Sequence, residues 1–333
     1  LVVLAGLAFS LTDNLAALVA AAIIGTVSPG GGEVGPSGAI EQAALPQTAP
    51  DRDRTAVFAW YNLVGSLATA VGALCGGALA QALLRAGWAP LTSYRAVLVG
   101  YALLGVALGI QALRLSPAVE APGFGGDTPA APGSLLGLSR SRDIVLRIAG
   151  LFVIDAFAGG LVVQSLIAYW LSVRFGADPA ALGAILFGAN LCAGFSALAA
   201  ARIAAKIGLV NTMVWTHLPS NVLLMLIPLM PSLPLVIAVL LARFSTSQMD
   251  VPTRQSYLAA VVDPGERAAA AGVTATARLL AVAVAPLASG ALLGAGMLAA
   301  PFMLAGGLKI VYDLMLYRAF RSVRPPEERG AAE

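Results

Sequence analysis

Long runs of apolar residues, separated by short polar turns, make up most of the chain. A helix of about 20 apolar residues crosses the roughly 30 Å hydrocarbon core of a bilayer. The pattern predicts ten membrane-spanning segments, four before a loop rich in Pro, Gly and Ala and six after it, with the first segment only part of a span. The segments are 1–10, 15–45, 55–84, 91–113, 144–171, 180–201, 209–230, 235–262, 268–295 and 299–320.

The Pro-, Gly- and Ala-rich loop divides the chain into two halves. We predict an N-terminal half over 1–114, the inter-half loop over 115–143, a six-helix C-terminal half over 144–321 and a polar tail over 322–333. A degenerate repeat links the halves, because several residues of the first half are matched by an identical or similar residue 213 positions later. It carries Gln42 to Gln255, Asp53 to Glu266, Arg54 to Arg267, Leu74 to Leu287 and Gly77 to Gly290. A period this long indicates two related halves of one membrane protein.

Composition supports this class. Hydrophobic residues make up 59% of the chain and charged residues 11%, and the mean hydropathy is +0.85. Soluble domains carry roughly 25% charged residues, so we expect an all-α polytopic membrane protein whose main partner is the lipid bilayer. The net charge of +3 reflects basic loops rather than a nucleic-acid partner.

Several chemistries have no visible basis in the sequence. His217 is the single histidine, so a histidine-based metal site or catalytic triad is hard to build, and we read it as lining a helix. No G-x-x-x-x-G-K-[ST] loop occurs, which argues against an ATP-driven pump. We expect no cofactor, no metal and no enzymatic activity, and a monomer.

The distribution of Lys and Arg predicts the topology. With the inter-half loop in the cytoplasm, thirteen of these residues lie inside and three outside, which follows the positive-inside rule. The loop and the C-terminus are therefore expected on the cytoplasmic face of the cytoplasmic membrane. The thirteen are Arg52, Arg54, Arg114, Arg140, Arg142, Arg147, Arg202, Lys206, Arg267, Arg318, Arg321, Arg324 and Arg329, and the three are Arg85, Arg95 and Arg174.

Two halves joined by a long loop, together with two turn motifs, resemble the major facilitator superfamily of secondary transporters. The stretch ARIAAKIGLVNTM resembles the basic cytoplasmic turn of the family, with Lys206 and Gly208 matching its R-x-G core. The stretch PGERAAAAG, from Pro264 to Gly272, resembles its P-x-x-R-x-x-x-x-G turn. The resemblance covers essentially the whole chain.

The resemblance implies a twelve-helix bundle of two six-helix halves, of which this chain carries about ten helices, starting within the third. It implies transport of a small solute by alternating access. The glycines in GSLATAVGALCGG look like the fifth helix of the proton-coupled antiporters of the superfamily, although the Gly-Pro of that pattern is missing. Proton-coupled efflux is slightly favoured, and a facilitator or symporter for a metabolite stays open.

Two carboxylates, Glu33 and Glu41, interrupt the second apolar segment. Ionisable groups inside a bilayer are costly and are functional candidates by default. Glu33 lies between Ser28-Pro29-Gly30 and Gly35-Pro36, where the helix is expected to bend, so it is a proton or substrate site or a cap for the break. Glu41 and its repeat mate Arg254 can close a cytoplasmic gate as an inter-half ion pair; otherwise each is paired within its own half.

Acids and bases also interrupt the spans of the C-terminal half. Asp155, in the first of these spans, is a second coupling candidate. Arg243, Asp250 and Arg254 are seven and four residues apart and are predicted to share one face of one helix, so Asp250 either neutralises an arginine or binds solute or proton.

Arg278 must find an acid on another helix or bind an anionic group of the substrate. Lys309 and Asp313 are four residues apart, so an intrahelical pair is expected. Gln164, Asn190 and Tyr169 line the cavity or serve helix contacts.

The remaining candidates lie in turns and act as caps, gates or loop-to-helix ion pairs. They are Asp53, Arg54, Glu266, Arg267, Arg202 and Lys206. Two competing functions remain: a polytopic membrane enzyme, for which no nucleophile or acid cluster is apparent, and a non-transporting receptor of the same fold.

Overall fold

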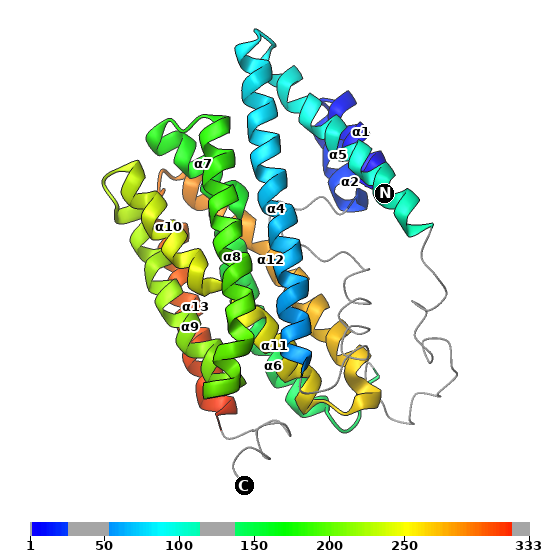
Figure 1. Ribbon diagram of the computed structural model, residues 1–333, viewed down its shortest axis with the longest axis vertical. Coiled ribbons are helices and arrows are strands. Elements are labelled where there is room, and N and C mark those ends of the chain that lie inside the picture. Colours follow the sequence, from blue (N-terminus) through cyan, green and yellow to red (C-terminus); the bar gives the residue numbers. More distant parts are fainter. Residues whose placement is uncertain (1, 26–52, 114–136, 322–333) are drawn as a thin grey trace.

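The computed structural model describes residues 2–25, 53–113 and 137–321 as helices joined by short turns (Figure 1). The helices of the first half are α1 (Val2–Leu11), α2 (Leu15–Gly25), α4 (Arg54–Arg85) and α5 (Pro90–Ala112). Those of the second half are α6 (Arg142–Leu161), α7 (Gln164–Phe175), α8 (Pro179–Ile207), α9 (Leu209–Leu226), α10 (Leu233–Ser247), α11 (Asp250–Val261), α12 (Arg267–Gly294) and α13 (Ala300–Phe320). Two 3-10 turns, η4 (Ile227–Leu229) and η5 (Pro264–Glu266), complete the order. Glu33 and Glu41 lie outside the described residues.

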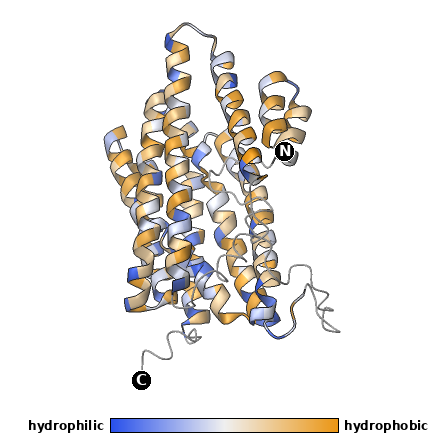
Figure 2. Ribbon diagram, turned by 45° about the vertical axis from the view of Figure 1, so that its right-hand side comes forward, coloured by the Kyte–Doolittle hydropathy of each residue, from blue (hydrophilic) through white to orange (hydrophobic). Residues whose placement is uncertain are grey.

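Seven helical stretches within the described ranges are long and apolar enough to cross a membrane: α4, α5, α6 with α7, α8, α9, α12 and α13. Figure 2 shows apolar residues along the length of these helices. The number is lower than the ten segments predicted from the sequence, in part because α1 has only 10 residues and the stretch 235–262 is divided into two shorter helices. The chain is an all-α polytopic membrane protein.

The predicted single helix over 235–262 is wrong. α10 ends at Ser247 and α11 begins at Asp250. Pro252 lies in the first turn of α11, where its missing N–H is tolerated, whereas in a continuous helix its ring would collide with the carbonyl of Gln248. Arg243 is thus on a different helix from Asp250 and Arg254.

The predicted span over 144–171 is also broken. α6 ends at Leu161, and Val162 leaves helical geometry with φ −132° and ψ 69° before α7 begins at Gln164. Gly159 and Gly160, which weaken a helix, directly precede the break. Gly160 also lies where α12 passes closest, because a Cβ added there would be 2.7 Å from the Cβ of Ala285.

α4, of the predicted first half, lies beside α8, of the predicted second half (Figure 1). The helices are antiparallel: Leu63 near the start of α4 lies against Gly194, and Gly77 near its end lies against Gly183. A Cβ added to Gly183 would lie 2.7 Å from the carbonyl oxygen of Ala73, so only glycine permits this approach.

The helix boundaries follow the repeat seen in the sequence. α4 begins at Arg54 and α12 at Arg267, a difference of 213. Both helices are preceded by residues in 3-10 conformation, which are Asp53 before α4 and η5 before α12. The inter-half loop and the division into halves otherwise stay predictions.

The turns between α8 and α9 and between α11 and α12 lie at one end of the bundle, with the start of α4 and the end of α13 (Figure 1). Arg202, Lys206 and Arg318, which the sequence places in the cytoplasm, are exposed at this end. These basic residues therefore lie at the same end of the bundle. That this end faces the cytoplasm stays a prediction.

Candidate functional site

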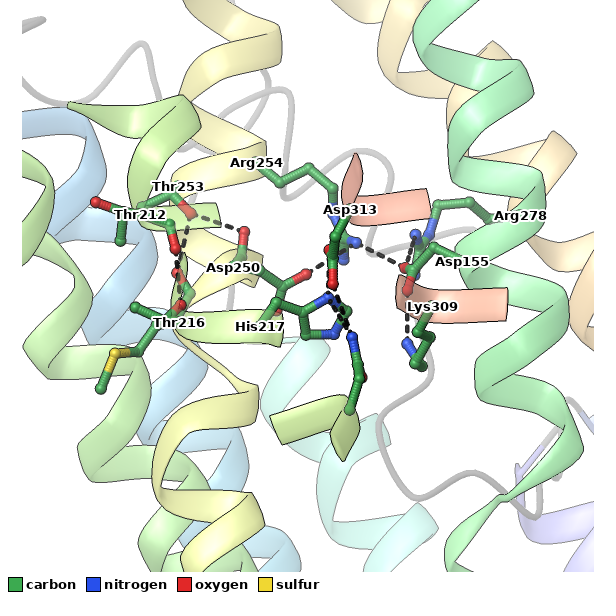
Figure 3. A network of polar contacts seen from close by, with 12 residues as sticks. Asp155, Thr212, Thr216, His217, Asp250, Thr253, Arg254, Arg278, Lys309 and Asp313 are labelled. Atoms are coloured by element: carbon green, nitrogen blue, oxygen red, sulfur yellow. Dashed lines mark hydrogen bonds and ion pairs between the residues drawn. The ribbon is translucent and has the colours of Figure 1, made fainter. Parts of the chain in front are cut away.

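Five helices of the second half, α6, α9, α11, α12 and α13, bring their charged side chains together inside the bundle (Figure 3). The network contains three carboxylates, three cations, the histidine and an amide. Its members are Asp155, His217, Asn221, Asp250, Arg254, Arg278, Lys309 and Asp313.

Asp155 of α6 is the hub of this network. The guanidinium groups of Arg254 and Arg278 donate to its Oδ2 atom at 2.9 and 3.1 Å, and the ammonium group of Lys309 donates to its Oδ1 atom at 2.5 Å. The three cations come from α11, α12 and α13, so a single carboxylate holds three other helices. The Asp155 side chain is 5% exposed, which means that this charge is almost fully removed from solvent.

Arg254 also contacts Asp250 on its own helix, with 3.2 Å between Nη1 and Oδ2. The predicted role of Asp250 as partner of an arginine is thereby confirmed for Arg254. For Arg254, pairing within its own half is what the structure shows, while the alternative partner Glu41 lies outside the described residues.

His217, Asn221 and Asp313 form the second part of the network. The Nδ1 atom of His217 lies 2.8 Å from Oδ1 of Asp313, and the Asn221 amide donates to Oδ2 of Asp313 at 2.8 Å. The predicted intrahelical pair of Lys309 with Asp313 is wrong, because Lys309 turns to Asp155 on α6 and Asp313 turns to α9. Asp313 therefore has a histidine and an amide as its bonded partners, rather than Lys309.

Aromatic rings border the charged groups. Arg254 and Arg278 lie over the ring of Phe152 at 5.1 and 5.7 Å from its centroid. Tyr312, 1% exposed, stands edge-on to the ring of His217. Since buried ions are stable only when they are well paired and hydrogen-bonded, the network fixes the relative positions of its helices.

Arg278 finds its acid on another helix, as one of the two predicted alternatives required. Arg243 differs, because among the described residues it forms no ion pair and its Nε atom is buried without a hydrogen-bond partner. Its guanidinium lies over Phe244 at 4.9 Å from the ring centroid.

Gln164 and Asn190 bond to each other across α7 and α8, with amide contacts of 2.9 and 3.3 Å. This pair serves as a helix contact. Tyr169 lines a cavity of about 280 Å³ between α7 and α12, together with Leu166 and Pro286.

Polar contacts between the halves lie beside Arg254 rather than at Arg254 itself. The Thr55 hydroxyl donates to the Ser256 hydroxyl at 2.7 Å, and the Asn62 amide donates to the Gln255 side-chain oxygen at 3.1 Å. These contacts join α4 to α11 near the end of the bundle that carries the basic turns.

Glu266 is the turn residue with the clearest structural role. Its carboxylate accepts backbone N–H bonds from Ser139, Arg140 and Ser141 at 2.9 to 3.0 Å, and a hydroxyl bond from Ser139. It thus ties the start of α12 to the segment that precedes α6. A cap or an ion pair was predicted here, and the Glu266 side chain makes no cap bond to α12. Arg202 and Lys206 are exposed. Asp53 and Arg267 each have an interaction partner. The side chain of Arg54 lies outside the described part of the structure.

Sequence reasoning missed His217, Asn221 and the true partners of Lys309 and Asp313. His217 and Asn221 are four residues apart, a spacing that puts two polar side chains on one face of an apolar helix. That spacing was a usable signal. Which acid they would meet depends on how α9 and α13 pack.

Comparison with known proteins gives a relative and a fold. No family model matches the chain. An uncharacterized membrane protein of Saccharomyces cerevisiae is 28% identical over 350 aligned residues, covering 97% of this chain and 78% of the relative. The crystal structure of a bacterial homologue of the iron transporter ferroportin, in its outward-facing state, has a TM-score of 0.59 at 15% identity, covering 95% of this chain and 79% of that one. At this identity the likeness shows the fold alone, and the chain is an all-α polytopic membrane protein that shares the fold of that transporter.

Proposed function

We propose that this chain is a proton-coupled secondary transporter of a small solute, working by alternating access. The observation that carries the proposal is the convergence on Asp155 of Arg254, Arg278 and Lys309 from three other helices. Ionisable groups at membrane depth that pair inside a bundle mark substrate or proton paths.

The proton site in this proposal is the contact of His217 with Asp313. Histidine is a common proton carrier in proteins, because a ring nitrogen can take up and release a proton. The groups that face it are Asp313 and Tyr312 of α13 and Asn221 of α9. Asp155, in contact with three cations, serves as the fixed ionised hub.

In this proposal α13 couples protonation of His217 to the cations around Asp155. Asp313 is on the same helix as Lys309, one turn away, and Lys309 contacts Asp155. A change of charge at the His217–Asp313 contact therefore alters the field at Lys309 and shifts the balance of the cations around Asp155. Such a shift is a local electrostatic change of the kind that biases two-state helical bundles.

The contacts of Thr55 with Ser256 and of Asn62 with Gln255 support alternating access. They are inter-half hydrogen bonds at one end of the bundle, which must break if that end opens. The orientation of this end toward the cytoplasm is part of the proposal and rests on the basic turns.

The name of the structural neighbour describes ferroportin as an iron transporter, and iron is not thereby a cargo of this chain. Among the described residues of this chain, no group of three His, Cys, Asp or Glu side chains is placed to hold a metal ion. Iron is therefore tested as one cargo among several, rather than assumed.

The test uses the purified protein in liposomes that contain a pH-sensitive dye. Candidate solutes are screened across an imposed pH gradient. We expect solute-dependent proton movement that His217→Gln and Asp313→Asn abolish, while Asp143→Asn, an exposed acid at the start of α6, leaves it intact. Solute flux without proton movement would indicate a facilitator, and ligand binding without flux would indicate a receptor.

A further inference from the structure

The cations around Asp155 are not equally enclosed. The side chains of Arg254 and Lys309 are each 10% exposed, whereas that of Arg278 is 31% exposed. Arg278 is also close to the middle of the apolar stretch Pro264–Gly294, which is long enough to cross a membrane.

Arg278 lies on the face of α12 that packs inside the bundle and not on the exposed face of the helix. Arg278 is four residues after Thr274 and seven before Ala285, both buried on the face of α12 that packs against α6. The strongly exposed residues Leu280 and Leu287 lie on the opposite face of the helix.

The guanidinium of Arg278 has unused hydrogen-bond donors. Within the described residues, its polar contact is the single bond from Nη1 to Oδ2 of Asp155. A guanidinium has five N–H donors in a planar fork that matches the two oxygens of a carboxylate. Moreover, Oδ2 of Asp155 accepts a hydrogen bond from Arg254 at 2.9 Å, shorter than the 3.1 Å bond from Arg278, so the two arginines share this oxygen.

The charges of this part of the network do not balance. The contacts join three cations, Arg254, Arg278 and Lys309, to two carboxylates, Asp155 and Asp250. The third carboxylate, Asp313, is bonded to His217 and Asn221 instead. Within these direct contacts the cations outnumber the carboxylates by one, because the third negative charge of the network lies on Asp313. Arg278 is the most exposed of the three cations.

From these observations we propose that Arg278 binds the carboxylate group of an anionic solute. A single accessible guanidinium fits a monocarboxylate better than a phosphate, which carries about −1.5 to −2 at neutral pH when it is attached to one group. The proposal rests on the proposed transport function, of which it names the substrate class: a small organic acid that Arg278 binds in competition with Asp155.

Binding is measured first, without transport. The thermal-unfolding midpoint of the purified protein is followed against acetate, lactate and benzoate at constant ionic strength, with chloride, inorganic phosphate, choline and ferrous iron as comparisons. We expect a saturable rise with a monocarboxylate, about 10- to 100-fold weaker binding in Arg278→Gln, partial retention in Arg278→Lys, and unchanged binding in Arg147→Gln, an exposed arginine on α6.

A second measurement avoids the variants, in case Arg278→Gln does not fold. Phenylglyoxal labelling of arginines in the unaltered protein, read by mass spectrometry, should be slowed at Arg278 by the monocarboxylate and unchanged at Arg147. Binding of phosphate, choline or iron in place of carboxylates, equal carboxylate binding by Arg278→Gln, or undiminished labelling would overturn the proposal.

The two proposals fail separately. If a monocarboxylate binds at Arg278 but no solute or proton moves in liposomes, the carboxylate site stands and the transport function falls. If the protein carries a cationic or neutral solute with protons and Arg278→Gln carries it equally well, the transport function stands and the carboxylate site falls.

Discussion

The ammonium group of Lys309 lies 2.5 Å from Oδ1 of Asp155, although the nearest acid on its own helix is Asp313, one turn away. Lys309 thereby links α13 to α6. Because Asp155 also holds arginines of α11 and α12, the position of four helices depends on one carboxylate.

Removal of that carboxylate is expected to be severe. Asp155→Asn leaves three cations, two of them buried, without their shared partner, and breaking a buried ion pair costs about 3–5 kcal/mol. Denaturant or thermal unfolding in detergent measures the loss. Asp143→Asn on the same helix, which is exposed, is the matched control.

A double variant separates charge from packing at the same site. If the loss in Asp155→Asn comes from uncompensated cations, combining it with Lys309→Met should restore part of the stability. Fully additive losses in this double-mutant cycle would mean that the two side chains do not act through their contact.

Gly160 is predicted to tolerate no side chain. In Gly160→Val, the added Cβ lies 2.7 Å from the Cβ of Ala285, so α6 and α12 must separate. Overpacking of this kind typically costs about 1–3 kcal/mol. Gly150→Ala is the control on the same helix, because a Cβ there meets nothing within 4 Å; equal thermal stability of the two variants would contradict the packing seen here.

The inter-half hydrogen bonds are predicted to hold one end of the bundle closed. Ser256→Ala removes the bond to Thr55, and Gln255→Ala removes the bond to Asn62, each worth about 0.5–1.5 kcal/mol. Distances between spin labels on α4 and α11 should then shift toward longer values. Ser245→Ala removes a hydroxyl that donates to the Leu241 carbonyl of its own helix and should leave the distance distribution unchanged.

Glu266 is predicted to hold the start of α6. Glu266→Gln replaces a carboxylate that accepts from Ser139, Arg140 and Ser141 by a neutral amide with weaker acceptor oxygen. We expect faster hydrogen exchange of these three amides and a lower unfolding temperature. Protection equal to that of the unaltered protein would show that the turn is held by other contacts.

The long apolar runs of the sequence predicted much of the fold. It predicted a helical membrane protein, and most spans of the second half lie close to the predicted ranges. The 213-residue repeat was read as a sign of two related halves, and the starts of α4 and α12 at Arg54 and Arg267 have the same spacing. These features are set by residues near one another in the chain, so the sequence contains them directly.

The helix breaks were accessible to sequence reasoning only in part. Pro252 is a readable signal for the division of 235–262, because proline affects the backbone four residues before it. The end of α6 at Leu161 is less readable, since Gly159 and Gly160 weaken a helix without fixing where it stops.

The charged residues of the site were nearly all visible in the sequence as interruptions of apolar runs, yet their partners were not. Only spacing within one helix can be read from the chain, and it gave Asp250 with Arg254 correctly and Lys309 with Asp313 wrongly. The choice between an acid on the same helix and one on another depends on how the helices pack against each other. Packing between helices, which places Asp155 of α6 within reach of α11, α12 and α13, is decided by contacts far apart in the sequence, so only the tertiary structure settles which cation meets which carboxylate.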